Sequence, residues 1–199
     1  NKNFNFKFKF ILLITFLLIS AFTISSSSFL KTRYITGFYL QIADKQERAK
    51  FLEHSIYVKL YKSGIAVFQN NPLFGVGNKN YRVVTCLPND EKKEGITKNY
   101  FCGTHPHHIY LELLSEHGFV GTVILLSLLF ILIFKNLKII ILSRNSVQLG
   151  CFVYLIINFI PLLPSGSFFN DFNASLFWTN MSLLYACDPK TNIFYKIRQ

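Results

Sequence analysis

The chain has 199 residues, of which 51% are hydrophobic and 17% aromatic, with 22 phenylalanines. This composition is too apolar for an ordinary soluble domain and indicates a membrane protein with one sizeable polar region. The formal net charge is +11, yet no basic run with interleaved aromatic residues is present, so we expect no nucleic-acid partner.

The first predicted membrane helix lies close to the start of the chain. Residues 10–30 carry no charge, and about 20 residues at 1.5 Å each match a bilayer core of about 30 Å. A cleaved signal peptide over residues 1–28 is the alternative, because basic residues precede the apolar stretch. No small-x-small cleavage site follows the stretch, however, so we expect a retained helix.

Two further apolar regions predict three more membrane helices. Residues 119–142 form one of them. Residues 145–187 contain a single charged side chain, Asp171, and are long enough for two passes. Pro161 and Pro164 supply the break between these passes. The sequence therefore predicts an all-α integral membrane protein with four transmembrane helices in this chain.

The distribution of positive charge predicts the orientation of these helices. Basic residues flank the spans on one side only, and by the positive-inside rule that side is cytoplasmic. They are Lys2, Lys7, Lys9, Lys135, Lys138, Arg144, Lys190, Lys196 and Arg198. Residues 1–30 then comprise a cytoplasmic tail and the first helix. Residues 31–118 form a large, partly helical periplasmic loop, and residues 188–199 form a second cytoplasmic tail.

Within the loop, the pattern predicts two helices, a turn and a polar excursion. Residues 46–69 have apolar positions at helical spacing and contain no proline. Residues 75–77 (Gly-Val-Gly) predict a tight backbone turn, and residues 88–98 a flexible polar excursion. Thr104 is a candidate N-cap for a second helix, which Gly118 is expected to end.

Four cysteines are present. Cys86 and Cys102 flank the polar excursion. In an oxidising compartment they would close a loop of about 15 residues and stabilise the fold by about 3 kcal/mol. The alternative is two free thiols; we favour the disulfide because the predicted topology places both residues in the periplasm. Cys151 and Cys187 lie in apolar segments, where cysteine behaves as a small buried hydrophobe.

A titratable cluster stands just before the second membrane helix. His105, His107 and His108 surround a proline, and histidine suits a general base or a charge stabiliser because its ordinary pKa lies near neutrality. Histidines that hydrogen-bond loop carbonyls are the structural alternative. Zinc is disfavoured, because no established metal-ligand spacing is present. Glu112 and Glu116 share a helix face with His108, either to orient a histidine or simply as the polar side of the helix.

Two cations follow the glycine turn. Lys79 and Arg82 come directly after residues 75–77, where they would meet the oxygens of an extended diphosphate, with Arg82 offering the better fork. The turn lacks the third glycine and the Gly-Lys-Ser/Thr ending of phosphate loops, so it is a weak phosphate-loop signal by itself. Taken singly, each cation is more simply a solvated surface charge.

An ordered set of motifs resembles the C-terminal region of the O-antigen ligase/O-antigen polymerase family, over about residues 55–186. The set includes a cysteine pair and three short segments, which read Asn-Pro-Leu-Phe-Gly-Val-Gly at 71–77, Asn-Tyr-Arg at 80–82 and Thr-His-Pro-His-His at 104–108. The proline turn at residues 161–169 resembles a late turn of the family.

The ligase motif of that family also matches in spacing. The motif is His, then Asn, Ser or Gln, then nine residues, then Gly-x-x-Gly. His107, His108 and residues 109–117 are followed here by Gly118-Phe119-Val120-Gly121. The one departure is His108, which stands in the amide or hydroxyl position of the motif and still offers hydrogen bonding.

The resemblance implies a multi-pass glycosyltransferase of the bacterial inner membrane with a GT-C-like fold, of which this chain would be the C-terminal part. Such enzymes take a glycan from an undecaprenyl diphosphate carrier on the periplasmic side. Ligases attach the glycan to lipid A–core, and polymerases attach it to another carrier-linked repeat. The resemblance further implies an inverting reaction that needs no metal and no cofactor.

The matching motif spacing favours a ligase over a polymerase. A non-catalytic membrane scaffold or transporter is the remaining alternative. A transporter would place ionisable residues inside its spans, and the predicted spans contain essentially none.

The resemblance also assigns roles to individual residues. His107 matches the catalytic histidine, which acts as a base on the acceptor hydroxyl or stabilises charge. The family holds the diphosphate with loop arginines, and a position that commonly carries one of them is Tyr57 here. The role then passes first to Arg82, with Arg48 or an arginine in the family's N-terminal half as the alternatives. The other substrate-binding candidates are Lys79, Arg48, His54 and His108.

Overall fold

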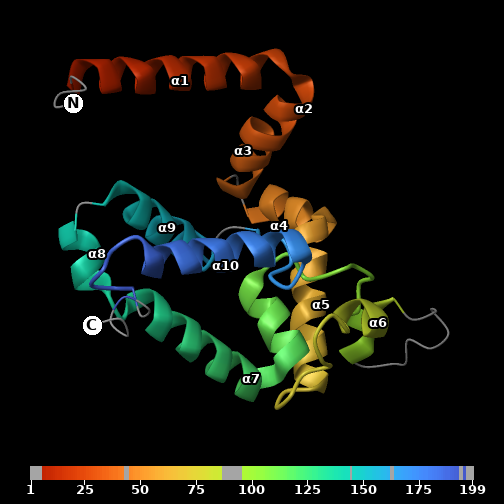
Figure 1. The fold of residues 1–199 in the computed structure, drawn as a ribbon. Coiled ribbons are helices and arrows are strands. Elements are labelled where there is room, and N and C mark those ends of the chain that lie inside the picture. The colour runs from red at the N-terminus through yellow and green to blue at the C-terminus, as the bar shows by residue number, and fades with distance from the viewer. Residues whose placement is uncertain are drawn as a thin grey trace. The chain divides into compact units, whose positions relative to one another are not determined.

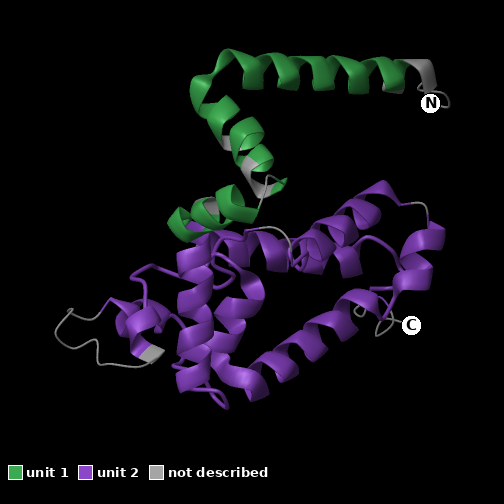
Figure 2. Cartoon of the chain, turned by 180° about the vertical axis from the view of Figure 1, so that it is seen from behind, with its two compact units in different colours: residues 1–55 green, residues 56–199 purple. Residues whose placement is uncertain are grey.

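The computed structural model describes residues 6–42, 45–86, 96–143, 145–161, 164–192 and 195. Every element in this part of the chain is a helix, and it contains no β-strand (Figure 1), which confirms the all-α prediction. The chain divides into two compact units, residues 1–55 and residues 56–199 (Figure 2). The predicted polar excursion at residues 88–98 lies mostly outside the described residues.

The first unit is a succession of helices. It contains α1 (Phe6–Ser26), α2 (Ser28–Leu30), a π-helical segment (Lys31–Thr36), α3 (Gly37–Ile42) and α4 (Lys45–His54).

The prediction of one continuous helix over residues 10–30 is wrong at Ser27. Ser27 has an extended backbone (φ −107°, ψ 118°), and its hydroxyl accepts a hydrogen bond from the N–H of Leu30. A serine with this geometry caps a new helix, so the apolar stretch is divided there.

The second unit contains the remaining helices. They are α5 (Ile56–Asn70), α6 (Tyr81–Thr85), a 3-10 turn η2 (Ile96–Asn99), α7 (Ile109–Phe134), α8 (Leu137–Ser143), α9 (Ser146–Ile157) and α10 (Asp171–Ala186). The single helix predicted over residues 46–69 is in fact two, because Ser55 separates α4 from α5.

The helix predicted to start at Thr104 begins later, at Ile109. Tertiary contacts with α5 hold the preceding segment in an irregular conformation. Ser63 accepts a hydrogen bond from the N–H of Phe101 at 3.0 Å. A Cβ on Gly64 would lie only 3.1 Å from the Pro106 side chain, so the buried proline sits directly on the helix. These contacts override the local capping signal.

The Asn-Pro-Leu-Phe-Gly-Val-Gly segment crosses α7 backbone to backbone at Gly118. Gly118 has non-helical angles (φ 65°, ψ −171°), so the predicted break is confirmed although the chain remains helical on both sides. A Cβ on Gly118 would lie 2.4 Å from the carbonyl oxygen of Leu73, and a Cβ on Gly75 would lie 2.4 Å from the carbonyl carbon of Glu116. Only glycine permits this approach.

Four backbone hydrogen bonds, of 2.8–3.1 Å, join the crossing segment to α7. Val76 and Gly77 donate to α7 carbonyls on one side of Gly118. Phe119 and Val120 donate back to the segment on the other side. These four bonds pair backbone groups on both sides of the break in α7 and fix where the loop after Gly77 begins.

One helical stretch among the described residues, Ile109–Ser143, is long and apolar enough to cross a membrane. The region around α1 meets the same criteria only when Phe10–Ser26 is joined to Ser28–Tyr39 across a bend. The apolar helix α9, with 12 residues, is shorter than a full span. The count of four membrane helices therefore stays a prediction.

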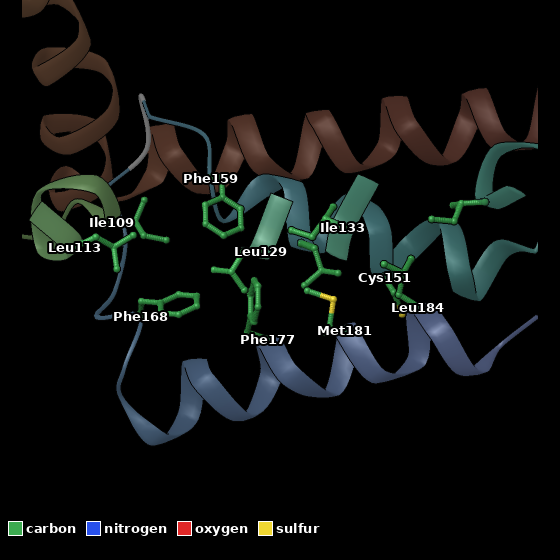
Figure 3. Packing of buried hydrophobic residues seen from close by; sticks show 12 residues of the cluster. Ile109, Leu113, Leu129, Ile133, Cys151, Phe159, Phe168, Phe177, Met181 and Leu184 are labelled. Atoms are coloured by element: carbon green, nitrogen blue, oxygen red, sulfur yellow. The ribbon is translucent and has the colours of Figure 1, made fainter. Parts of the chain in front are cut away.

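The second half of α7 packs with α9 and α10 around a continuous apolar core (Figure 3). Leu129 and Ile133 of α7 meet Leu155 of α9 and Phe177 of α10, and all four are almost completely buried. The outer faces of the same helices are also apolar and exposed, including Ile124, Ile131, Val153, Trp178 and Leu183. Helices that are apolar all round suit a lipid environment.

Candidate active site

An open cavity of about 470 Å³ lies in the second unit, between the loop after Gly77, the histidine segment and the proline turn. It brings together residues from four separate stretches of the chain. Its lining consists of Lys79, Arg82, Val83, Thr104, His105, Glu116, Ser167 and Asn170. The cavity thus combines two cations, a histidine and a carboxylate with several hydroxyl and amide groups.

Lys79 and Arg82 line the cavity together. The Lys79 ammonium is 3.7 Å from the Asp171 carboxylate, and both side chains are largely exposed. Such a surface pair is worth at most about 1 kcal/mol, so Lys79 can exchange this partner for a more strongly charged ligand. Arg82 is exposed on α6 and presents a planar fork suited to phosphate oxygens.

His105 is the histidine that lines the cavity. Its Nδ1 is 3.0 Å from the Thr104 hydroxyl, and its buried Nε2 has no hydrogen-bond partner within the described part of the chain. Burial lowers the pKa of His105, and the neighbouring His107 lowers it further, while the nearby backbone of Ser165 opposes the shift. His105 is therefore held toward its neutral form.

His107, the histidine singled out by the motif, lies beside His105. The two ring centres are 4.0 Å apart, and the ring of Tyr57 meets His107 edge-on at 5.8 Å. The backbone of His107 is left-handed (φ 55°), and its carbonyl accepts a hydrogen bond from Ser165 at 3.0 Å. A non-glycine residue in this conformation is uncommon and is often found at functional sites.

His108 faces the proline turn. Its Nε2 is 3.0 Å from the Pro161 carbonyl oxygen, which can only accept, so Nε2 carries the proton. The ring of Tyr61 packs edge-on against it at 5.3 Å. The first contact ties the residue before α7 to the turn, and the second packs it against α5. His108 is not part of the cavity lining.

Arg48 and His54 lie on α4 in the first unit and are exposed. The Nδ1 of His54 is 2.9 Å from the carbonyl oxygen of Lys50 within the same helix. Their assignment to substrate binding stays a prediction.

Glu112 and Glu116 make contacts that the sequence reasoning missed. Both side chains are buried, which is unlike the solvated helix face expected from their spacing. Glu116 accepts hydrogen bonds from the backbone N–H groups of Lys79 and Tyr81. Glu112 accepts from the hydroxyl of Ser167 and from a neighbouring backbone N–H. The sequence indicated these contacts only through two glutamates among the apolar residues of one predicted helix. The loops that they bind are seen in the folded chain.

A disulfide joins Cys86 to Cys102, with Cα atoms 4.4 Å apart. Cys86 follows α6, which carries Arg82, and Cys102 precedes His105 by three positions. The covalent link therefore joins the helix that carries Arg82 to the segment that leads to His105.

Metal ligation has no support among the described residues, where no group of three or more His, Cys, Asp or Glu side chains could hold an ion.

The second unit thus is a helical structure in which two cations, two neighbouring imidazoles and two buried carboxylates lie near the start of a helix long and apolar enough to cross a membrane. A family model described as O-antigen ligase matches residues 2–126, which is more than half of the chain. The chain belongs to this family of membrane proteins, which supports an O-antigen ligase or polymerase-type activity and an enzyme of the glycosyltransferase type. Neither the curated proteins nor the solved structures that were compared gave a match.

Proposed function

We propose that this chain forms the periplasmic transfer site of an O-antigen ligase in the bacterial inner membrane. The enzyme would move a glycan from undecaprenyl diphosphate to lipid A–core. One observation carries the proposal: Lys79, Arg82 and His105 line the same open cavity, and His107 lies beside it. A diphosphate leaving group needs cations, and an acceptor hydroxyl needs a base.

The reaction is a single displacement at the anomeric carbon. His107 takes the proton of the acceptor hydroxyl, and the acceptor oxygen forms a bond to the anomeric carbon. The bond from that carbon to the diphosphate breaks on the opposite side, so the configuration inverts. Lys79 and Arg82 stabilise the negative charge that remains on the undecaprenyl diphosphate. No metal or cofactor takes part in this scheme.

The remaining sequence candidates have supporting roles in the proposal. Arg48 and His54 remain substrate-binding candidates on the motif resemblance alone. His108 would keep the start of α7 against the proline turn, as its bond to Pro161 suggests.

An O-antigen polymerase is the second candidate. His108 stands where the ligase motif has Asn, Ser or Gln. This departure from the ligase motif favours the polymerase. The same donor chemistry serves both enzymes, and only the acceptor differs. It is lipid A–core for a ligase and a carrier-linked repeat for a polymerase.

The test is glycan transfer in cells that lack their own ligase. The full-length protein should move carrier-linked O-antigen onto lipid A–core, and His107→Ala at equal expression should abolish the transfer. Longer carrier-linked glycans without transfer to lipid A–core would instead identify a polymerase. Full transfer by His107→Ala would remove His107 from the catalytic role.

A further inference from the structure

Two buried carboxylates stand one helical turn apart on the first half of α7. Glu112 and Glu116 are 1% and 2% exposed. Burying a carboxylate is costly unless hydrogen bonds compensate it, and like charges four positions apart on a helix repel. The two glutamates therefore need an explanation other than packing.

Each carboxylate bonds a different loop. Glu116 accepts from the N–H of Lys79 at 2.9 Å and from the N–H of Tyr81 at 3.4 Å. Glu112 accepts from the N–H of Phe168 at 2.9 Å and from the Ser167 hydroxyl. Each glutamate thus accepts two hydrogen bonds from one loop, and loss of a buried acceptor is costly, so each side chain is an effective anchor for its loop.

The two anchored loops form separate walls of the cavity. One wall carries Lys79 and Arg82, and the other carries Ser167 and Asn170. Lys79 also has a left-handed backbone (φ 61°), a conformation that persists only where the surroundings hold it. Glu116 supplies that hold through the N–H of the same residue.

We propose that Glu112 and Glu116 are positioning residues that set the two walls of the cavity before the donor binds. The inference rests on the proposed function, because the walls matter as the binding site of a lipid-linked diphosphate. Glu116 fixes the loop that carries the cations, and Glu112 fixes the turn that faces it. Holding charged groups in place before the reaction removes the cost of ordering them during it.

Hydrogen exchange of the purified full-length protein tests the anchors without any assay of activity. Glu116→Gln keeps the side-chain length but loses the charge. It should speed exchange at residues 78–82 by about tenfold or more and leave residues 165–169 unchanged. Glu112→Gln should do the reverse. Glu53→Gln, at an exposed glutamate, is the matched control and should change neither segment. A uniform rise across the chain, or none at all, would overturn the inference.

A double-variant cycle tests the link to catalysis. Glu116→Gln and Lys79→Ala should each lower kcat/KM for transfer by about tenfold or more. In the double variant, kcat/KM should fall by less than the product of the two single-variant reductions, because Glu116 acts partly through Lys79. The effects of Glu112→Gln and Lys79→Ala should come closer to the full product, because Glu112 bonds the other wall and the contact between Lys79 and Asp171 that joins the walls is exposed. If the reductions caused by Glu116→Gln and Lys79→Ala simply multiply, Glu116 does not act through Lys79. If the parent transfers no glycan, the proposed function fails, and the exchange pattern still decides whether the carboxylates anchor the walls.

Discussion

His105 and His107 present two imidazole rings whose centres lie 4.0 Å apart. A positive charge on His107 would disfavour a second one on His105 at this distance. Since burial and the neighbouring ring both disfavour the charged form of His105, its pKa lies below the ordinary value of 6.5. His105 should then stay neutral as the pH falls from 7 through 6.5, which leaves Lys79 and Arg82 as the cations of the cavity.

Nuclear magnetic resonance of histidine-labelled protein checks this expectation. The resonance that disappears in His105→Gln should titrate with a midpoint below pH 6.5. A midpoint at or above 6.5 would show that His105 is protonated more readily than its burial allows.

At the residue scale, the sequence identified the cations and the histidines but not their neighbours. Lys79 and Arg82 follow a glycine turn, and that local signal was enough to propose an anion site. Glu116 was read with two alternatives, neither of which is an anchor for a loop. The contact joins residues 37 apart in sequence, and no spacing within a helix encodes it.

At the element scale, the crossing of α7 by the Asn-Pro-Leu-Phe-Gly-Val-Gly segment depends on two glycines. Gly118 has backbone angles that are essentially restricted to glycine, and an added Cβ would overlap the backbone of Leu73. Gly118→Ala should therefore lower the free energy of unfolding by about 3 kcal/mol or more.

Thermal unfolding of the purified protein in detergent measures the effect. The matched control is Gly150→Ala, because a Cβ there would meet nothing within 4 Å on an exposed helical position. That variant should be neutral or more stable by up to about 1 kcal/mol. Equal stability of the two variants would contradict the role assigned to the crossing.

The disulfide makes a second prediction at this scale. The bond between Cys86 and Cys102 spans 16 positions, and closing a loop of this length stabilises a fold by about 3 kcal/mol. A reducing agent should lower the melting temperature of the parent and leave that of the Cys86→Ser/Cys102→Ser double variant unchanged. A parent that does not respond to complete reduction would show that the link contributes nothing.

The elements themselves were predicted unevenly, for identifiable reasons. The break at Gly118 and the turn at residues 75–77 follow from glycine chemistry and are present. The helix start at Thr104 was wrong because Pro106 packs on Gly64, a tertiary contact that no local rule contains. The division at Ser27 was missed because Ser27 caps a new helix within a run of four serines. The length of the uncharged stretch alone favoured one continuous helix.

At the scale of the whole molecule, the topology remains the prediction with the widest consequences. The positive-inside rule assigns the cavity to the periplasm and the region after α10 to the cytoplasm. Cysteines introduced by Lys62→Cys and Lys190→Cys, both at exposed positions, report the two sides in a Cys187→Ser background. An impermeant maleimide should label the first in cells with an intact inner membrane and the second only after that membrane is disrupted. Labelling in the opposite order would invert the topology.

We propose that the cavity lined by Lys79 and Arg82 receives the diphosphate of the donor. Its most direct test is transfer by the purified full-length protein from a lipid diphosphate donor, comparing Arg82→Ala with Lys62→Ala. Lys62 is an exposed cation on α5 that does not line the cavity, so it controls for a change of charge alone. We predict that Arg82→Ala lowers kcat/KM by about 100-fold or more, while Lys62→Ala stays within about twofold of the parent. Equal activity of the two variants would show that the diphosphate binds elsewhere in the protein.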